Sequence, residues 1–199
     1  MRGLIRELLD SGISSIFDPA PVSFKPEHER GVPLLRKLLK GSSSRIQKLP
    51  KKLTRNSFLL GCLDFTENEP IEHLIIGYGT KKGIGTDIYQ IQHLIGNESS
   101  VEIPDSIIKS INTHSYSVPK SEVVIFHNHP YNWLNALFDN TPLPSAADRQ
   151  TMLKKKYLEP FQLIRSLLKL GGVRFYLGEN GFVREIRTPS LLRMLVSLD

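Results

Sequence analysis

The sequence predicts a layered α/β domain, because short apolar runs typical of strands occur together with segments of helical pattern. Strands are expected near residues 57–64, 71–78, 86–92 and 122–127, and a helix near 104–113, directly after Pro104. Asn180-Gly181 separates two further apolar runs, 173–177 and 182–186, which is a strong hairpin signal. With 199 residues, of which 40% are hydrophobic, the chain is long enough to bury one substantial core.

The N-terminal part is expected to differ from the rest. We predict a helical and basic segment over residues 1–52 and the main domain over 53–199. Residues 1–10 mix charged with apolar positions and lack a continuous apolar region, so they indicate a short amphipathic helix and not a signal peptide. No run of the sequence approaches the length of a membrane span, and a single cysteine, Cys62, offers no disulfide framework. The expected compartment is the cytoplasm.

Turns and the C-terminal third complete the expected element order. Residues 81–83, Lys-Lys-Gly, indicate a hairpin turn between the second and third strands. A helix is expected to begin at Ser145, to bend or break at Pro160 and to stop at Gly171-Gly172. Residues 190–199 suggest a short amphipathic helix at the end of the chain.

The most informative motif is His127-Asn128-His129-Pro130, which follows the apolar run 123–126. Side chains alternate along a strand, so both histidines should point to one face of the sheet and Asn128 to the other. Pro130 cannot donate to a strand ladder, which places the pair at the end of the strand. Together with Asp148 they form the ligand set of a catalytic zinc site, which typically has three protein ligands and one open position.

Each part of this motif also has a structural interpretation. Two histidines at this spacing are common without a metal. The segment Ser145-Ala146-Ala147-Asp148 also resembles a helix N-terminus, with a serine cap and an acid three residues later. The two interpretations are compatible, because a helix N-terminus can direct the carboxylate to a metal and leave the hydroxyl available.

The run His-Asn-His-Pro, followed by Pro-Ser-x-x-Asp, resembles the JAB/MPN (JAMM) zinc metallopeptidase superfamily, and its RadC-like branch in particular. Ser57 to Asp64, and residues 71–80 ending in Gly-Thr, are similar to further parts of that pattern, so that the resemblance covers about residues 56–186. It implies a cytidine-deaminase-like layered sandwich with a mixed central sheet. It also implies that zinc is bound by His127, His129 and Asp148 beside Ser145.

The resemblance implies a zinc-dependent peptidase or isopeptidase, a hydrolase in which a zinc-activated water attacks a peptide or ubiquitin-like isopeptide bond. Ser145 would donate a hydrogen bond to the water or the developing oxyanion. Two alternatives stay open. One is a RadC-like protein associated with nucleic acid, and the other is a JAB-fold pseudoenzyme that serves as an interaction module.

Two features depart from the family pattern. Residues 130–144 form a longer stretch between the second histidine and Ser145 than the family has, and the apolar, aromatic segment 131–138 within it suggests local packing, an oligomer contact or a lid. The family's general-base glutamate aligns with Asn56, which cannot accept a proton from water. Other acids are candidates for this role: Glu27 and Glu29, in a stretch that reads as irregular, and also Glu67, Glu69 and Glu72.

The formal net charge of +6 is unevenly distributed. Residues 36–55 contain eight basic and no acidic residues, and Gly41 and Pro50 argue against one continuous helix there. Such a run is often a solvated linker or face. The functional alternative is contact with nucleic acid or another acidic partner.

Overall fold

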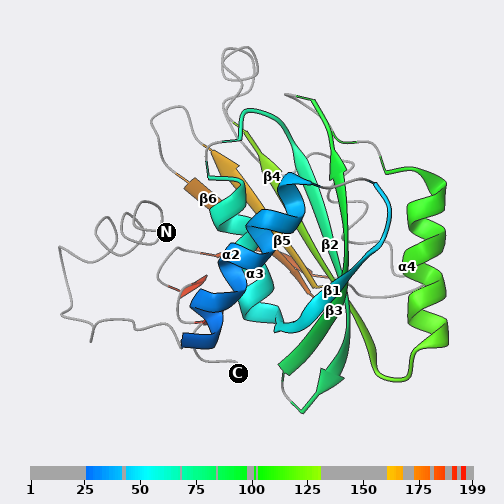
Figure 1. Ribbon diagram of the computed structural model, residues 1–199. Helices are drawn as coiled ribbons and strands as arrows, with labels where there is room; N and C mark the ends of the chain where they lie inside the picture. The colour runs from blue at the N-terminus through cyan, green and yellow to red at the C-terminus, as the bar shows by residue number, and fades with distance from the viewer. Residues whose placement is uncertain are drawn as a thin grey trace.

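The computed structural model describes residues 26–41, 44–67, 69–83, 85–97, 101, 103–130, 161–167, 173–179, 182–186, 190–191 and 194–195. Within them lie seven strands and three helices, in the order α2 (Pro26–Lys40), β1 (Gln47–Thr54), α3 (Arg55–Phe65), β2 (His73–Lys82), β3 (Gly85–Ile95), α4 (Asp105–Ser117), β4 (Ser121–His129), β5 (Phe161–Leu167), β6 (Val173–Glu179) and β7 (Phe182–Ile186). The mixed α/β class predicted from the sequence is confirmed (Figure 1).

All seven strands belong to one mixed sheet with the order β1-β3-β2-β4-β5-β6-β7. Strands β1, β3, β2 and β4 pair antiparallel, β4 and β5 pair parallel, and β5, β6 and β7 pair antiparallel. The expected hairpins are present: β2 pairs with β3 down to Lys82 and Gly85, and β6 pairs with β7 up to Glu179 and Phe182. Gly83 in the first turn has a φ of +62°, a conformation that glycine adopts without a steric cost.

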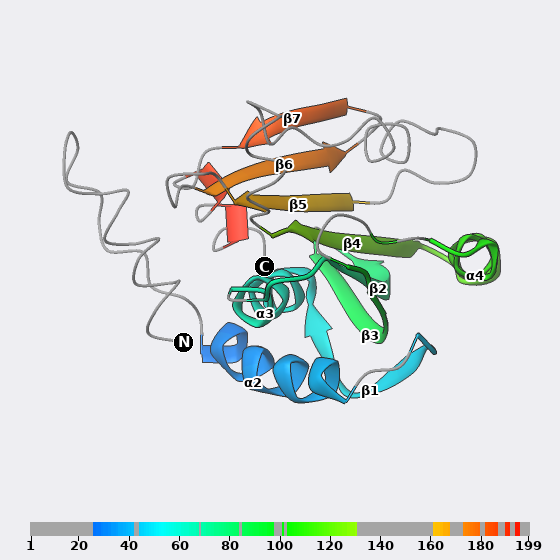
Figure 2. The ribbon, with the colours of Figure 1, turned by 90° about the horizontal axis from the view of Figure 1, so that it is seen from above.

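Helices lie against both faces of this sheet (Figure 2). Helices α2 and α3 cover one face and share the larger hydrophobic core, which includes Val124 and Phe126 of β4. Helix α4 covers the other face, where Ile107 packs in a second core with Val123 and Ile125. Strand β4 is therefore buried on both sides, which explains why its central residues 123–126 are all apolar.

The segment expected as a strand near 57–64 is instead part of helix α3. Thr54 caps this helix, because its hydroxyl accepts a hydrogen bond from the Ser57 amide. Nine of its eleven residues are buried between α2 and the sheet. A helix that is apolar on nearly all sides has no amphipathic period, so the pattern alone could not distinguish it from a buried strand.

Two further expectations were wrong. The region predicted to resume as helix after Pro160 contains β5, which is held between β4 and β6; residues 145–160 lie outside the described part. The basic run was expected to belong to a helical segment, but Gln47–Thr54 form the edge strand β1. Its pairing register shifts between Lys48 and Leu53, and Pro50 is accommodated in this irregular part of an edge strand.

Strand β1 spans the expected boundary between an N-terminal segment, residues 1–52, and the main domain, residues 53–199. The boundary between residues 52 and 53 falls inside this strand, which pairs with β3. Helix α2 packs on α3, and Leu35 and Leu39 of α2 lie in the larger core. The described part of the N-terminal segment is therefore packed into the same α/β unit. Residues 1–25 lie outside the described part, and none of the described helices is long and apolar enough to cross a membrane.

Candidate metal centre

Strand β4 places His127 and His129 on the same face of the sheet, as predicted. Val123 and Ile125 precede them at the same two-residue spacing and point toward α4. The two imidazole rings lie with their centroids 4.4 Å apart. The His127 side chain is 10% exposed and that of His129 23%, so the pair lies at the open end of a buried strand.

Glu72 lies across from these histidines, one residue before β2 begins. In the β2–β4 register Leu74 pairs with His127, so Glu72 continues the same face of the neighbouring strand. The backbone of Glu72 extends the hairpin with β3: its amide donates to the Asn97 carbonyl over 2.7 Å, and its carbonyl accepts from the Gly96 amide over 2.8 Å. The position of the carboxylate is thus fixed by the sheet.

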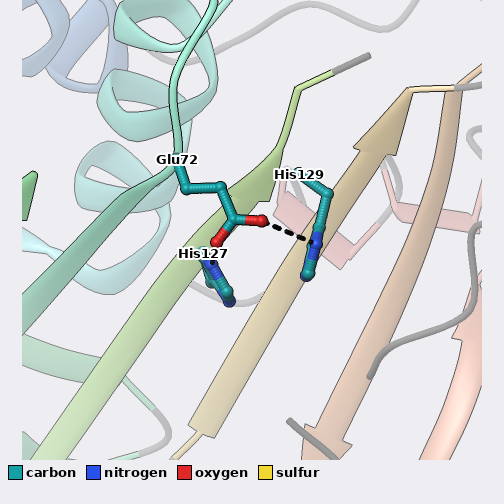
Figure 3. Close-up of side chains that lie close together, drawn as sticks. All are labelled: Glu72, His127 and His129. Carbon is teal, nitrogen blue, oxygen red and sulfur yellow. Dashed lines mark hydrogen bonds and ion pairs between the residues drawn. The ribbon is translucent and has the colours of Figure 1, made fainter. Parts of the chain in front are cut away.

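The Glu72 carboxylate contacts both imidazoles (Figure 3). One oxygen, Oε2, lies 3.0 Å from Nε2 of His127, and the other, Oε1, lies 3.2 Å from Nδ1 of His129. The Glu72 side chain is only 5% exposed. The three side chains come from the end of β4 and the start of β2, which are 55 residues apart in sequence but adjacent in the sheet.

These contacts fix the protonation of the group. Burial alone would raise the pKa of Glu72, but hydrogen bonds from His127 and His129, and the charge of these rings, lower it from 4.5 to about 2. The carboxylate therefore stays ionised at neutral pH and accepts hydrogen bonds from both rings. Its contribution to folded-state stability is present above its ordinary pKa near 4.5 and is lost as the pH falls through about 2.

The three side chains have the chemistry of a metal site. One ligand atom from each of Glu72, His127 and His129 lies within 4.8 Å of the others. Two imidazole nitrogens and one carboxylate oxygen are a common ligand set for zinc, and a site with three protein ligands leaves a position open for water or substrate. A buried carboxylate also lowers the cost of holding a cation in this partly enclosed place.

The other residues proposed from the sequence are placed as follows. Ser145 and Asp148 lie outside the described residues. The backbone at Glu27 and Glu29 is helical, in the first turn of α2, and not irregular as expected; their side chains are outside the described part. Glu69 lies 3.6 Å from Nε2 of His73. His73 in turn contacts His93 over 2.8 Å, and this histidine pair is buried.

Asn56, the position that the resemblance assigns to the general base, lies in a helix and not directly before a strand. It is buried in the first turn of α3, and the neighbouring Arg55 pairs with Glu122 near the start of β4. Glu122 precedes His127 by five residues, which in a strand corresponds to about 17 Å. Among the described residues, the acid that lies beside the histidines is Glu72, one of the five glutamates considered from the sequence.

A signal for Glu72 was present in the sequence. Glu72 is the second residue of the strand expected at 71–78, and the strand expected at 122–127 ends at His127. Antiparallel pairing of two such strands brings the start of one beside the end of the other. The pairing partner of each strand is set by the whole sheet, however, and nothing in the local pattern identifies it.

A comparison with protein-family models finds no match to this chain, and a comparison with curated proteins finds none either. The argument for function therefore depends on the geometry of the site and on the motif.

Proposed function

We propose that the chain is a zinc-dependent hydrolase of the JAB type, which cleaves a peptide bond or the isopeptide bond of a ubiquitin-like protein. The observation that supports it most is the Glu72 carboxylate in contact with both His127 and His129. This arrangement supplies an acid beside the histidines, which the alignment at Asn56 lacked. It favours an enzyme over a pseudoenzyme of the same fold.

The fold supports the same proposal. The resemblance implies a layered α/β sandwich with a mixed sheet, and the chain has a mixed sheet with helices on both faces. The histidines lie at the end of a central strand, where the metal site of such a domain is expected. We therefore propose the JAB/MPN fold for residues 53–199, packed in one α/β unit with α2 and the first part of β1.

The proposed roles follow from the chemistry of each side chain. His127 and His129 would hold the metal, with Asp148 as the third ligand. Zinc would supply a Lewis acid that activates water and polarises the substrate carbonyl. Ser145 would donate a hydrogen bond to the developing oxyanion.

Glu72 would accept the proton of the attacking water and pass it to the leaving amine. When the imidazole nitrogens bind a metal they no longer donate hydrogen bonds to Glu72. Its carboxylate oxygens can then accept hydrogen bonds from the attacking water, as a general base requires.

Removal of the metal tests this proposal directly. We expect the purified chain to bind about one zinc per molecule by elemental analysis. Dialysis against a chelator should abolish cleavage of a fluorogenic peptide amide and of a lysine-linked ubiquitin dimer, and added zinc should restore it. Stoichiometric zinc without cleavage of either probe would favour the pseudoenzyme, and a chain that binds no zinc would contradict the proposed site.

A second candidate function is nucleic-acid binding, as in the RadC-like alternative. Five bases of the run 36–55 are solvent-exposed, on α2, on the edge strand β1 and between them. We call them the basic surface: Lys37, Lys40, Arg45, Lys48 and Lys51. The other three bases form ion pairs, Arg36 with Asp64, Lys52 with Asp87 and Arg55 with Glu122. Lysines on an edge strand also prevent edge-to-edge association, so the surface needs a direct test.

If the basic surface binds nucleic acid, affinity should fall steeply with salt, because each neutralised phosphate releases counterions. Changing Lys48 and Lys51 together to Gln should weaken binding to a short duplex and reduce the slope of log K against log[salt] by about 2. The matched control changes Lys109 of α4 and Lys120, which are exposed outside the basic surface. Equal effects of the two pairs, measured by fluorescence anisotropy, would show only a general charge effect.

A further inference from the structure

Asn128 lies between the two histidines in sequence, but its side chain does not join their cluster. It is fully buried and makes two hydrogen bonds to the backbone of the segment that carries Glu72. Its Oδ1 accepts from the His73 amide over 2.7 Å, and its Nδ2 donates to the Ile71 carbonyl over 3.1 Å. The side chain thus holds the peptide groups on both sides of Glu72.

These bonds complete the anchoring of Glu72 within the sheet. Alternate residues of a strand direct their backbone groups to opposite neighbours. Glu72 directs its own amide and carbonyl toward the residues that follow β3, where Asn97 and Gly96 satisfy them. Ile71 and His73 direct their backbone groups toward β4, but the pairing of β2 with β4 ends at His73 and Asn128. The Asn128 side chain therefore makes the hydrogen bonds to the His73 amide and the Ile71 carbonyl that backbone pairing no longer provides.

From this geometry we propose that Asn128 is a positioning residue that holds the Glu72 carboxylate against the two imidazoles. The inference rests on the proposed function for its catalytic consequence, but the placement itself can be tested without metal or substrate. Among side chains of this length, only that of asparagine carries a hydrogen-bond acceptor and a hydrogen-bond donor in one plane. Aspartate would keep the acceptor for the His73 amide and lose the donor to the Ile71 carbonyl, and alanine would lose both.

The first test uses the metal-free protein labelled with ¹⁵N-histidine. Imidazole protons donated to a buried carboxylate should give slowly exchanging, downfield resonances from His127 and His129. Asn128→Ala should abolish or broaden both resonances, and Asn128→Asp should weaken them. The matched control is Tyr78→Phe, which removes another buried hydrogen bond, the 2.7 Å bond from the Tyr78 hydroxyl to Gln92. It should leave the resonances unchanged.

The second test asks whether Asn128 acts through Glu72. Partners that orient the groups of a metal site typically contribute about 10–100-fold to activity or metal affinity. We expect Asn128→Ala to lower kcat by about this factor with little change in KM. In a Glu72→Gln background the same substitution should have almost no further effect, because the group that it positions is already lost.

The outcomes separate this inference from the proposed function. Unchanged imidazole resonances in folded Asn128→Ala or Asn128→Asp protein would overturn the positioning role, whatever the activity. An equal loss of kcat with and without Glu72 would also overturn it, since that indicates a general structural effect. If Glu72→Gln leaves hydrolysis unchanged, the proposed catalytic role of Glu72 fails, while the resonances still decide whether Asn128 holds the carboxylate.

Discussion

Glu72→Gln is expected to lower zinc-dependent hydrolysis by about 10²–10⁴-fold, the usual contribution of a general acid or base. Glutamine has nearly the same shape and can still exchange hydrogen bonds with the two imidazoles. It cannot accept a proton from water. The zinc content should stay near one per chain, because His127, His129 and Asp148 are the proposed ligands. The two measurements are the initial rate on the fluorogenic peptide amide and elemental analysis of the same sample.

Loss of zinc in Glu72→Gln would show that Glu72 is itself a metal ligand, a role that the mutual distances of its carboxylate and the two imidazoles also permit. Hydrolysis that continues at the original rate would contradict both roles. Glu27→Gln and Glu29→Gln serve as matched controls, since they make the same chemical change at the two glutamates first considered from the sequence. We expect them to change neither zinc content nor rate.

Asn56→Glu provides a control in the opposite direction. If Asn56 occupied the base position, this substitution would raise hydrolysis. The structure places Asn56 in the buried first turn of α3, on the side of the sheet opposite to α4. A carboxylate there would be buried, so we expect a lower melting temperature and no gain in activity.

The sequence predicted most of the α/β framework and the histidine pair, for a physical reason. Strand β4 is buried on both faces and ends at a proline, so its apolar run and the alternation of its side chains determine where His127 and His129 point. The β2–β3 and β6–β7 hairpins could also be predicted from the sequence, because turn residues such as Gly83 and Asn180-Gly181 indicate them locally.

The errors came where tertiary contacts decide the structure. Residues 57–64 are apolar on nearly every side because α3 is enclosed between α2 and the sheet, and this removes the helical period. Residues 161–167 form β5 because β4 and β6 are available on both sides. The resemblance placed the general base at Asn56, directly before a strand expected to begin at Ser57. That segment is the helix α3, and among the described residues the acid beside the histidines is Glu72, just before β2.

The substitution of both His127 and His129 by Ala is expected to have the largest effect on the metal. It removes two of the three proposed ligands and leaves no imidazole at the site, and the remaining carboxylates alone do not form a zinc site of the usual kind. Zinc should fall from about one per chain to a small fraction by elemental analysis. Hydrolysis should fall by about 10³-fold or more, since a bound metal supplies several kcal/mol of transition-state stabilisation.

A matched control removes two imidazoles elsewhere, at His93, which is buried, and at His114, which is partly buried on α4. That double variant should keep its zinc, and circular dichroism should show that both double variants are folded. The His127 and His129 variant also leaves Glu72 buried without its two hydrogen-bonding partners, which will cost stability in the metal-free protein. If a folded sample nevertheless retains stoichiometric zinc, the metal is bound elsewhere, and the site built on the end of β4 is excluded.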